Sequence, residues 1–127
     1  MKTRFAVAMG MLAGIGIGAT AVQGLHAQAK APVYLVTEID VTNADAYVKE
    51  YAPLAQASIK KAGGKLLAAS LQVTAVEGTA PKRVAIQVWD NLDQIQAWRS
   101  GDDYKDARKI GDKYATFRSY ALPGMAQ

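Results

Sequence analysis

Two segments of the sequence constrain the fold more than any other feature, because both alternate along their length. Residues 33–41 read VYLVTEIDV, and residues 83–89 read RVAIQVW. Side chains of a β-strand point alternately to opposite faces of a sheet, so each segment predicts a strand with two unlike sides. One side of each is aliphatic, and the other mixes aromatic, aliphatic and polar residues. The sheet therefore has one ordinary core face and a second face whose surroundings are not obvious.

The segment after the first strand predicts a helix. Residues 44–62 carry an apolar stripe at helical spacing, and Thr42 or Asn43 can serve as the N-cap. Pro53 lies inside the stripe, and proline removes a backbone hydrogen bond from a helix interior. We therefore expect a kink or a break near residues 49–51.

The second half of the chain adds two strands and a broken helix. The expected elements are a second strand over Lys65–Glu77, bent near Ser70; a helix from Asn91, interrupted at Ser100-Gly101; a helical segment over Asp102–Tyr114; and a fourth strand over Thr116–Leu122. Asn91 and Gln94 have the layout of a capping box at the helix start. The order β-α-β-β-α-β is ferredoxin-like, an α+β fold with helices on one face of a four-stranded antiparallel sheet.

Two helices can cover only one face of such a sheet, so the other face must meet something else. We expect the aliphatic rows on the covered face, namely Leu35 and Ile39 with Val84, Ile86 and Val88. The open face then holds Tyr34, Val36, Glu38, Gln87, Trp89 and a row of the fourth strand, either Arg118, Tyr120 and Leu122 or Phe117, Ser119 and Ala121. An exposed apolar patch indicates a partner surface or a ligand site. The simplest partner is a second copy, sheet against sheet with twofold symmetry, with polar members lining a small pocket.

Six side chains are candidate ligand-binding residues: Tyr34, Glu77, Arg83, Gln87, Trp89 and Arg118. The two arginines could clamp an anion through bidentate hydrogen bonds, or could belong to structural ion pairs. Tyr34 and Trp89 could wall a pocket, or could be buried anchors of a dimer. Glu77 lies at a strand end, where a turn-stabilising or pairing role competes with ligand binding.

Glu38 is the candidate catalytic residue. A carboxylate on a partly apolar sheet face has its charged form disfavoured, so it could titrate nearer neutrality and act as a base. The alternatives are an ion pair with Arg83 or Arg118, or a solvated position at the sheet edge.

The first 29 residues differ from the rest of the chain. Lys2 and Arg4 precede an uncharged run from Phe5 to about Leu25, and residues 27–29 form an A-x-A pattern. This layout predicts a signal peptide cleaved near Ala29, a domain over residues 30–127, and a periplasmic or secreted location. The run is also long enough to span a bilayer, so we expect membrane attachment only if the leader stays uncleaved.

Composition excludes several kinds of site from the predicted mature domain. The chain has no cysteine, and its one histidine, His26, lies in the leader. Zinc sites of the usual kinds, haem ligation, cysteine nucleophiles and histidine triads are therefore excluded, and we expect no cofactor and no metal. Loss of Lys2 and Arg4 lowers the formal net charge from +4 to +2, with both signs interleaved along the chain. We therefore expect no nucleic-acid partner.

The segment from Val33 to Gly124 resembles the domain-of-unknown-function family 1330 (DUF1330), of the dimeric α+β barrel group of ferredoxin-like folds. The resemblance rests on the order and spacing of several pieces: YLVTEIDV, Ala46-Tyr47 with Tyr51, Ala62-Gly63-Gly64-Lys65, Val76-Glu77-Gly78, Pro81-Lys82-Arg83-Val84, the Trp89-Asp90-Asn91 exit, Ala97-Trp98 and Asp103-Tyr104. It implies the fold and a homodimer, and no activity, because the family is uncharacterised.

Three functions follow as hypotheses. The first is an exported homodimeric domain that binds a small molecule. The second is a cofactor-independent oxygenase or isomerase acting on a small acidic or phenolic substrate, with Glu38 as base and Arg118 or Arg83 holding the anion. The third is a structural or interaction module without a ligand.

Overall fold

A computed structural model describes residues 31–125, of which Pro32–Gly124 form one compact unit. The predicted leader, residues 1–29, lies outside the described residues. The elements are β1 (Val33–Val41), α2 (Ala44–Ala46), the π-helical turn η1 (Tyr47–Tyr51), α3 (Ala52–Ala62), β2 (Lys65–Ser70), β3 (Arg83–Trp89), α4 (Leu92–Ser100), α5 (Asp102–Gly111) and β4 (Ala115–Pro123). None of the helices within residues 31–125 has the length and apolar character needed to cross a bilayer.

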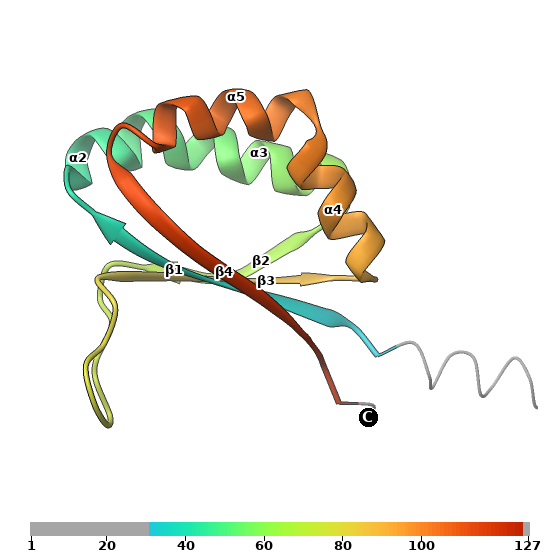
Figure 1. The fold of residues 1–127 in the computed structure, drawn as a ribbon, viewed down its shortest axis with the longest axis horizontal. Helices are drawn as coiled ribbons and strands as arrows, with labels where there is room; N and C mark the ends of the chain where they lie inside the picture. Colours follow the sequence, from blue (N-terminus) through green and yellow to red (C-terminus); the bar gives the residue numbers. More distant parts are fainter. Residues whose placement is uncertain (1–30, 126–127) are drawn as a thin grey trace, which may run out of the picture. The chain divides into compact units, whose positions relative to one another are not determined.

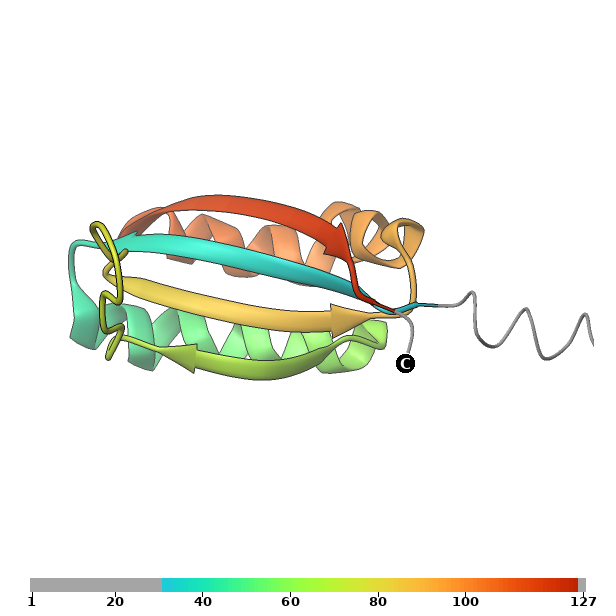
Figure 2. The ribbon, with the colours of Figure 1, turned by 90° about the horizontal axis from the view of Figure 1, so that it is seen from below.

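The strands form one antiparallel sheet in the order β2-β3-β1-β4. All helices lie on one face of it, and the other face carries no element of the compact unit (Figures 1 and 2). The predicted ferredoxin-like α+β fold is therefore confirmed, with the second helix divided into α4 and α5 at Gly101 as expected.

The pairing register corrects the predicted division of side chains between the two faces. Leu35 pairs with Gln87 and Val33 pairs with Trp89, and directly paired residues point to the same face. The row Arg83, Ala85, Gln87 and Trp89 therefore lies under the helices, and the row Val84, Ile86 and Val88 lies on the open face. The prediction that Gln87 and Trp89 belong to the open face is wrong.

Close packing against a glycine explains this correction. Trp89 is the most buried large side chain of the described residues, at 2% exposure. Its indole lies over Gly64, where even a Cβ atom would come within 2.5 Å of the ring. A large aromatic side chain fills a two-layer core better than a short aliphatic one, so the Trp89 row is the inner row. On β4, the row on the open face is Arg118, Tyr120 and Leu122, the first of the two predicted alternatives.

The break predicted from Pro53 is present as a π-helical turn. The amide of Ala52 donates to the carbonyl of Tyr47, five residues back, so the turn is wider than in an α-helix. Proline has no N–H to give to a carbonyl four residues earlier, which accounts for the change of register at this point. Pro53 then sits in the first turn of α3, where it is tolerated.

The helix starts follow the predicted caps. Asn43 accepts a hydrogen bond from the amide of Ala46 at 3.1 Å, and Asn91 accepts one from the amide of Gln94 at 2.8 Å. The Gln94 side chain reaches back to the amide of Asp90 at 2.9 Å, which completes a capping arrangement close to the predicted box.

The second strand is shorter than predicted. It has a bulge between Leu66 and Ala68 and ends at Ser70, so the expected continuation to Glu77 is wrong. Residues 71–82 instead form a loop that extends from the sheet on the side opposite the helices (Figure 1). Val76, in this loop, is 99% exposed.

Candidate functional site

A cavity lies between the sheet and the helices. Its walls come from all four strands below and from η1, α3, α4 and α5 above. About 40 Å³ is open to the centre of a water molecule, which is room for roughly three waters. The polar side chains that line it within the described chain are Thr37, Tyr47, Tyr51, Gln56, Arg83, Gln87, Arg99, Tyr104 and Ser119.

Arg83, the first residue of β3, is the unusual member of this lining. Its side chain enters the helix-covered layer, and the residue is only 8% exposed. The guanidinium carbon lies 5.1 Å from the ring centroid of Tyr47. Within residues 31–125, Arg83 Nε is the one buried side-chain nitrogen or oxygen that has no hydrogen-bond partner. Buried charges are normally paired, because removing an ion from water without compensation is costly.

The cavity offers Arg83 no counter-ion. The described residues that line it include no aspartate, glutamate or histidine. The fixed charge at this end of the cavity is therefore positive, and a negatively charged group would be attracted to it.

Three tyrosines contribute to the opposite wall. Tyr47 and Tyr51 come from η1, where the wide turn brings their rings to 5.0 Å between centroids. The hydroxyl of Tyr51 donates to that of Tyr104 at 3.2 Å, and Nη1 of Arg108 donates to the same oxygen at 3.3 Å. Burial raises the pKa of Tyr47, and burial together with the neighbouring Tyr104 raises the pKa of Tyr51. These phenols therefore remain protonated at neutral pH and act as hydrogen-bonding groups.

Three further polar side chains, those of Gln87, Thr37 and Ser119, complete the floor. Trp89 Nε1 donates to Gln87 Oε1 at 2.9 Å, and since an indole can only donate, this bond fixes the orientation of the amide. The amide NH₂ of Gln87 is therefore left as a donor. Across β1 and β4, the hydroxyls of Thr37 and Ser119 lie 3.0 Å apart.

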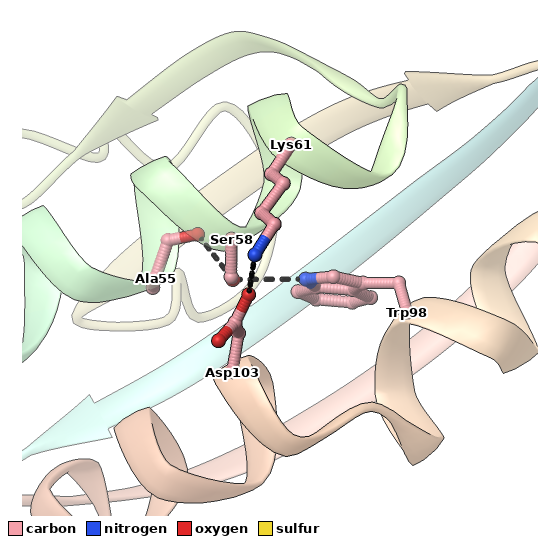
Figure 3. Close-up of polar contacts among 5 residues, drawn as sticks. All are labelled: Ala55, Ser58, Lys61, Trp98 and Asp103. Atoms are coloured by element: carbon pink, nitrogen blue, oxygen red, sulfur yellow. Dashed lines mark hydrogen bonds and ion pairs between the residues drawn. The ribbon is translucent and has the colours of Figure 1, made fainter.

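The helical wall is held together by polar contacts between α3 and the last two helices (Figure 3). Trp98 Nε1 donates to Ser58 Oγ at 3.0 Å, and that hydroxyl donates to the carbonyl of Ala55 at 2.7 Å. Lys61 and Asp103 form an ion pair at 3.0 Å on the outer surface. Trp98 also packs against Tyr104, with 4.1 Å between ring centroids. These contacts fix the rings that border the cavity.

The open face carries a different polar cluster. Glu38 on β1 accepts hydrogen bonds from Arg118 Nη2 at 2.7 Å and from the hydroxyl of Tyr120 at 2.6 Å. The bond from Tyr120 and the charge and hydrogen bond of Arg118 lower the pKa of Glu38. A carboxylate with a lowered pKa is a weaker base.

The structure thus distributes the residues singled out from the sequence over three places. Arg83 and Gln87 line the cavity, and Trp89 lies behind Gln87 in the core. Tyr34, Glu38 and Arg118 lie on the opposite, open face of the sheet, as their paired positions require. Glu77 lies in the exposed loop after β2. Their roles in binding and catalysis stay predictions.

Sequence reasoning missed part of the cavity lining. The polar members it did not select are Thr37, Tyr47, Tyr51, Gln56, Arg99, Tyr104 and Ser119. The tyrosines fall on apolar helical stripes, where an aromatic residue is indistinguishable from a core residue. The one available signal was Pro53, because a π-helical turn frequently accompanies a functional site.

Comparisons with known proteins agree with this architecture. An α+β, ferredoxin-like domain is the class that the fold defines. The chain belongs to the family described as "Domain of unknown function (DUF1330)", whose profile matches residues 32–125. A search of the curated proteins finds no match.

Two solved structures are similar in fold. One is a protein of unknown function from Rhodopseudomonas palustris, with 14% identity, a TM-score of 0.64, and coverage of 77% of this chain and 85% of that one. The other is the cofactor-independent oxygenase SnoaB from Streptomyces nogalater, with 13% identity, a TM-score of 0.58, and coverage of 76% and 96%. At these identities the likeness establishes the fold alone.

Proposed function

We propose that this domain binds a small carboxylate in the cavity between its sheet and its helices, with Arg83 as the anchor. The observation that carries the proposal is the buried guanidinium whose Nε has no partner and whose surroundings hold no acidic side chain. A carboxylate would supply both the missing acceptor and the missing charge. The free volume of about 40 Å³ suits an acid of two or three carbons.

A binding role is better supported than acid–base catalysis. The described lining of the cavity holds no carboxylate or imidazole, and its phenols Tyr47 and Tyr51 have raised pKa values. Glu38, the predicted base, lies on the other face of the sheet and is paired with Arg118. An oxygenase or isomerase reaction that uses Glu38 would therefore need a second ligand site on the open face. A purely structural module would leave the buried charge of Arg83 without a reason.

The proposal includes a homodimer formed through the open face of the sheet. That face carries Val36, Val84, Ile86, Val88, Tyr120 and Leu122, and the last two are 45% and 47% exposed. A contiguous row of exposed apolar side chains is typical of a partner interface. The loop of residues 71–82 extends on the same side of the sheet, where its exposed Val76 would meet the second copy (Figure 1).

Export by cleavage near Ala29 is also proposed, and sequencing the N-terminus of protein secreted by the native host would test it.

Arg83→Met tests the binding proposal. Titration of the wild-type domain with acetate, followed by NMR chemical shifts, should give saturable shifts in residues that line the cavity, and acetamide, the neutral analogue, should give none. The Arg83→Met variant should lose acetate binding. At the same time its free energy of unfolding should rise by about 1–3 kcal/mol, because an unsatisfied buried polar group is removed. Opposite effects on binding and stability are the mark of a residue kept for function.

Arg118→Met is the matched control, since it removes an arginine from the opposite face of the same sheet. It should leave acetate binding unchanged. Retention of binding by Arg83→Met, or its loss in Arg118→Met, would contradict the assignment of the anchor to the cavity.

A further inference from the structure

The hydroxyl of Tyr104, a residue that lines the cavity, has an unused proton. Its oxygen accepts two hydrogen bonds, from Tyr51 at 3.2 Å and from Arg108 at 3.3 Å. A phenolic oxygen that accepts twice can still donate once, and the structure gives the Tyr104 hydroxyl no acceptor within the described chain. The residue is 6% exposed, and its ring is fixed against Trp98. The free donor therefore has a defined position.

Arg108 holds a positive charge behind this hydroxyl. Its Nε donates to Asp112 at 2.8 Å, and its guanidinium carbon lies 3.9 Å from the ring centroid of Phe117. Burial opposes the charge of Arg108, but the hydrogen bonds to Asp112 and Tyr104 outweigh it and raise its pKa. A hydroxyl that accepts from a cation is polarised and becomes a stronger donor.

Three polar groups of the cavity lining present donors, and their acceptor atoms are absent or already in use. Arg83 has only N–H groups, the amide oxygen of Gln87 is occupied by Trp89, and the oxygen of Tyr104 already accepts two bonds. At these three groups a ligand hydroxyl would have to compete for an acceptor that is already occupied. A ligand whose polar groups are all acceptors would leave fewer buried groups unsatisfied.

We infer that the ligand is a 2-oxo carboxylate, whose carboxylate binds Arg83 and whose oxo oxygen accepts the hydrogen bond of Tyr104. This inference rests on the proposed function, because it requires the anion site at Arg83. In this arrangement Tyr104 selects the ligand by its second oxygen, and Arg108 is a positioning residue that orients and polarises the Tyr104 hydroxyl. Carboxylic acids of the same size that lack the oxo group, or carry a hydroxyl in its place, bind more weakly.

The test compares pyruvate, propionate and lactate, which are similar in size and differ at one position. Dissociation constants are measured by calorimetry at pH 7 and constant ionic strength for the wild-type chain and for Tyr104→Phe. The wild type should bind pyruvate most tightly. Tyr104→Phe should lower pyruvate affinity roughly fivefold to tenfold, the worth of one hydrogen bond, and should leave propionate affinity within about twofold. Tyr114→Phe, which removes a surface hydroxyl bonded to Glu50, serves as the control and should change neither.

Several outcomes would overturn the inference. Equal losses for pyruvate and propionate in Tyr104→Phe would assign Tyr104 a structural role only, and a retained preference for pyruvate would remove it from the site. If Tyr104→Phe does not fold, the three dissociation constants of the wild type still test the ligand class. Tighter binding of lactate or propionate than of pyruvate would contradict it. Binding of propionate that depends on Arg83, without a preference for pyruvate, would reject this inference and retain the proposed function. Absence of binding for all three acids would reject both.

Discussion

Each face of the sheet carries an arginine, and the two arginines lie in opposite environments. Arg118 lies on the open face, where its side chain is 73% exposed and is paired with Glu38 at 2.7 Å. Arg83 lies on the helix-covered face, is 8% exposed, and has an Nε without a partner. An exposed ion pair contributes little to stability and needs no functional explanation. A buried guanidinium with no counter-ion and an unsatisfied Nε reduces stability, so Arg83 is the arginine that indicates a site.

The two faces also differ in how far they bury their apolar side chains. The covered face buries Trp89 and Leu35 almost completely, at 2% and 4% exposure. The open face carries Ile86 and Val36, which stay partly exposed in the single chain. The covered face is therefore complete within one chain apart from its cavity, and the open face is the one for which we propose a partner. Each of the three experiments below changes one face and uses a second position as its control.

Truncation of Trp89 should have the largest effect on stability. Trp89→Ala removes the most buried large side chain and leaves a void beside Gly64, so we expect the free energy of unfolding to fall by about 3–5 kcal/mol. Urea denaturation at one fixed protein concentration would measure it. Val88→Ala, one residue earlier and on the open face, should cost about 1 kcal/mol or less when both variants are measured at a concentration too low for the proposed dimer to form. Similar losses for both variants would mean that the two faces are not packed differently.

A charge at the centre of the open face should break the proposed dimer. Ile86 pairs with Val36 at the middle of the sheet, and a twofold axis would bring Ile86→Lys near its own copy. Burying like charges against each other costs several kcal/mol, so the molar mass from light scattering should fall to that of one chain. Gln96→Lys adds the same charge on the exposed side of α4 and should remain dimeric. A wild type that is monomeric at high concentration would disprove the interface.

Much of the fold could be predicted because its signals are local. The alternation of β1 and β3, the caps at Asn43 and Asn91, and the break before Pro53 each depend on a few neighbouring residues. The extent of β2 could not be predicted this way. Its end at Ser70 depends on the length of β3, which offers the next segment no partner beyond Arg83.

The assignment of faces could not be predicted, because alternation shows that the two sides of a strand differ and does not say which is inside. Aliphatic content favoured Val84, Ile86 and Val88 as the inner row. The inner row is set instead by the register between β1 and β3 and by the space that Gly64 leaves for Trp89. Arg83 was selected from the sequence as an anion clamp, but its burial among tyrosines from η1 and α5 is a property of the tertiary structure.

The smallest predicted effect concerns the Glu38 cluster and its dependence on pH. Hydrogen bonds from Tyr120 and Arg118 lower the pKa of Glu38 below its ordinary value of 4.5. A lowered pKa means that the ionised form stabilises the folded state above pH 4.5, and that this contribution is lost as the pH falls through the folded pKa. The same bond raises the pKa of Tyr120 above its ordinary value of 10.0, so the contribution is also lost in strong alkali.

Melting temperatures of the wild type and Glu38→Gln should therefore differ slightly between these limits and converge in acid. Glu77→Gln, which removes a carboxylate from the exposed loop, controls for the change in net charge. If instead the Glu38→Gln difference grew as the pH fell below 4.5, the protonated carboxyl would be the stabilising form, and the predicted role of Glu38 as a base would gain support over the ion pair.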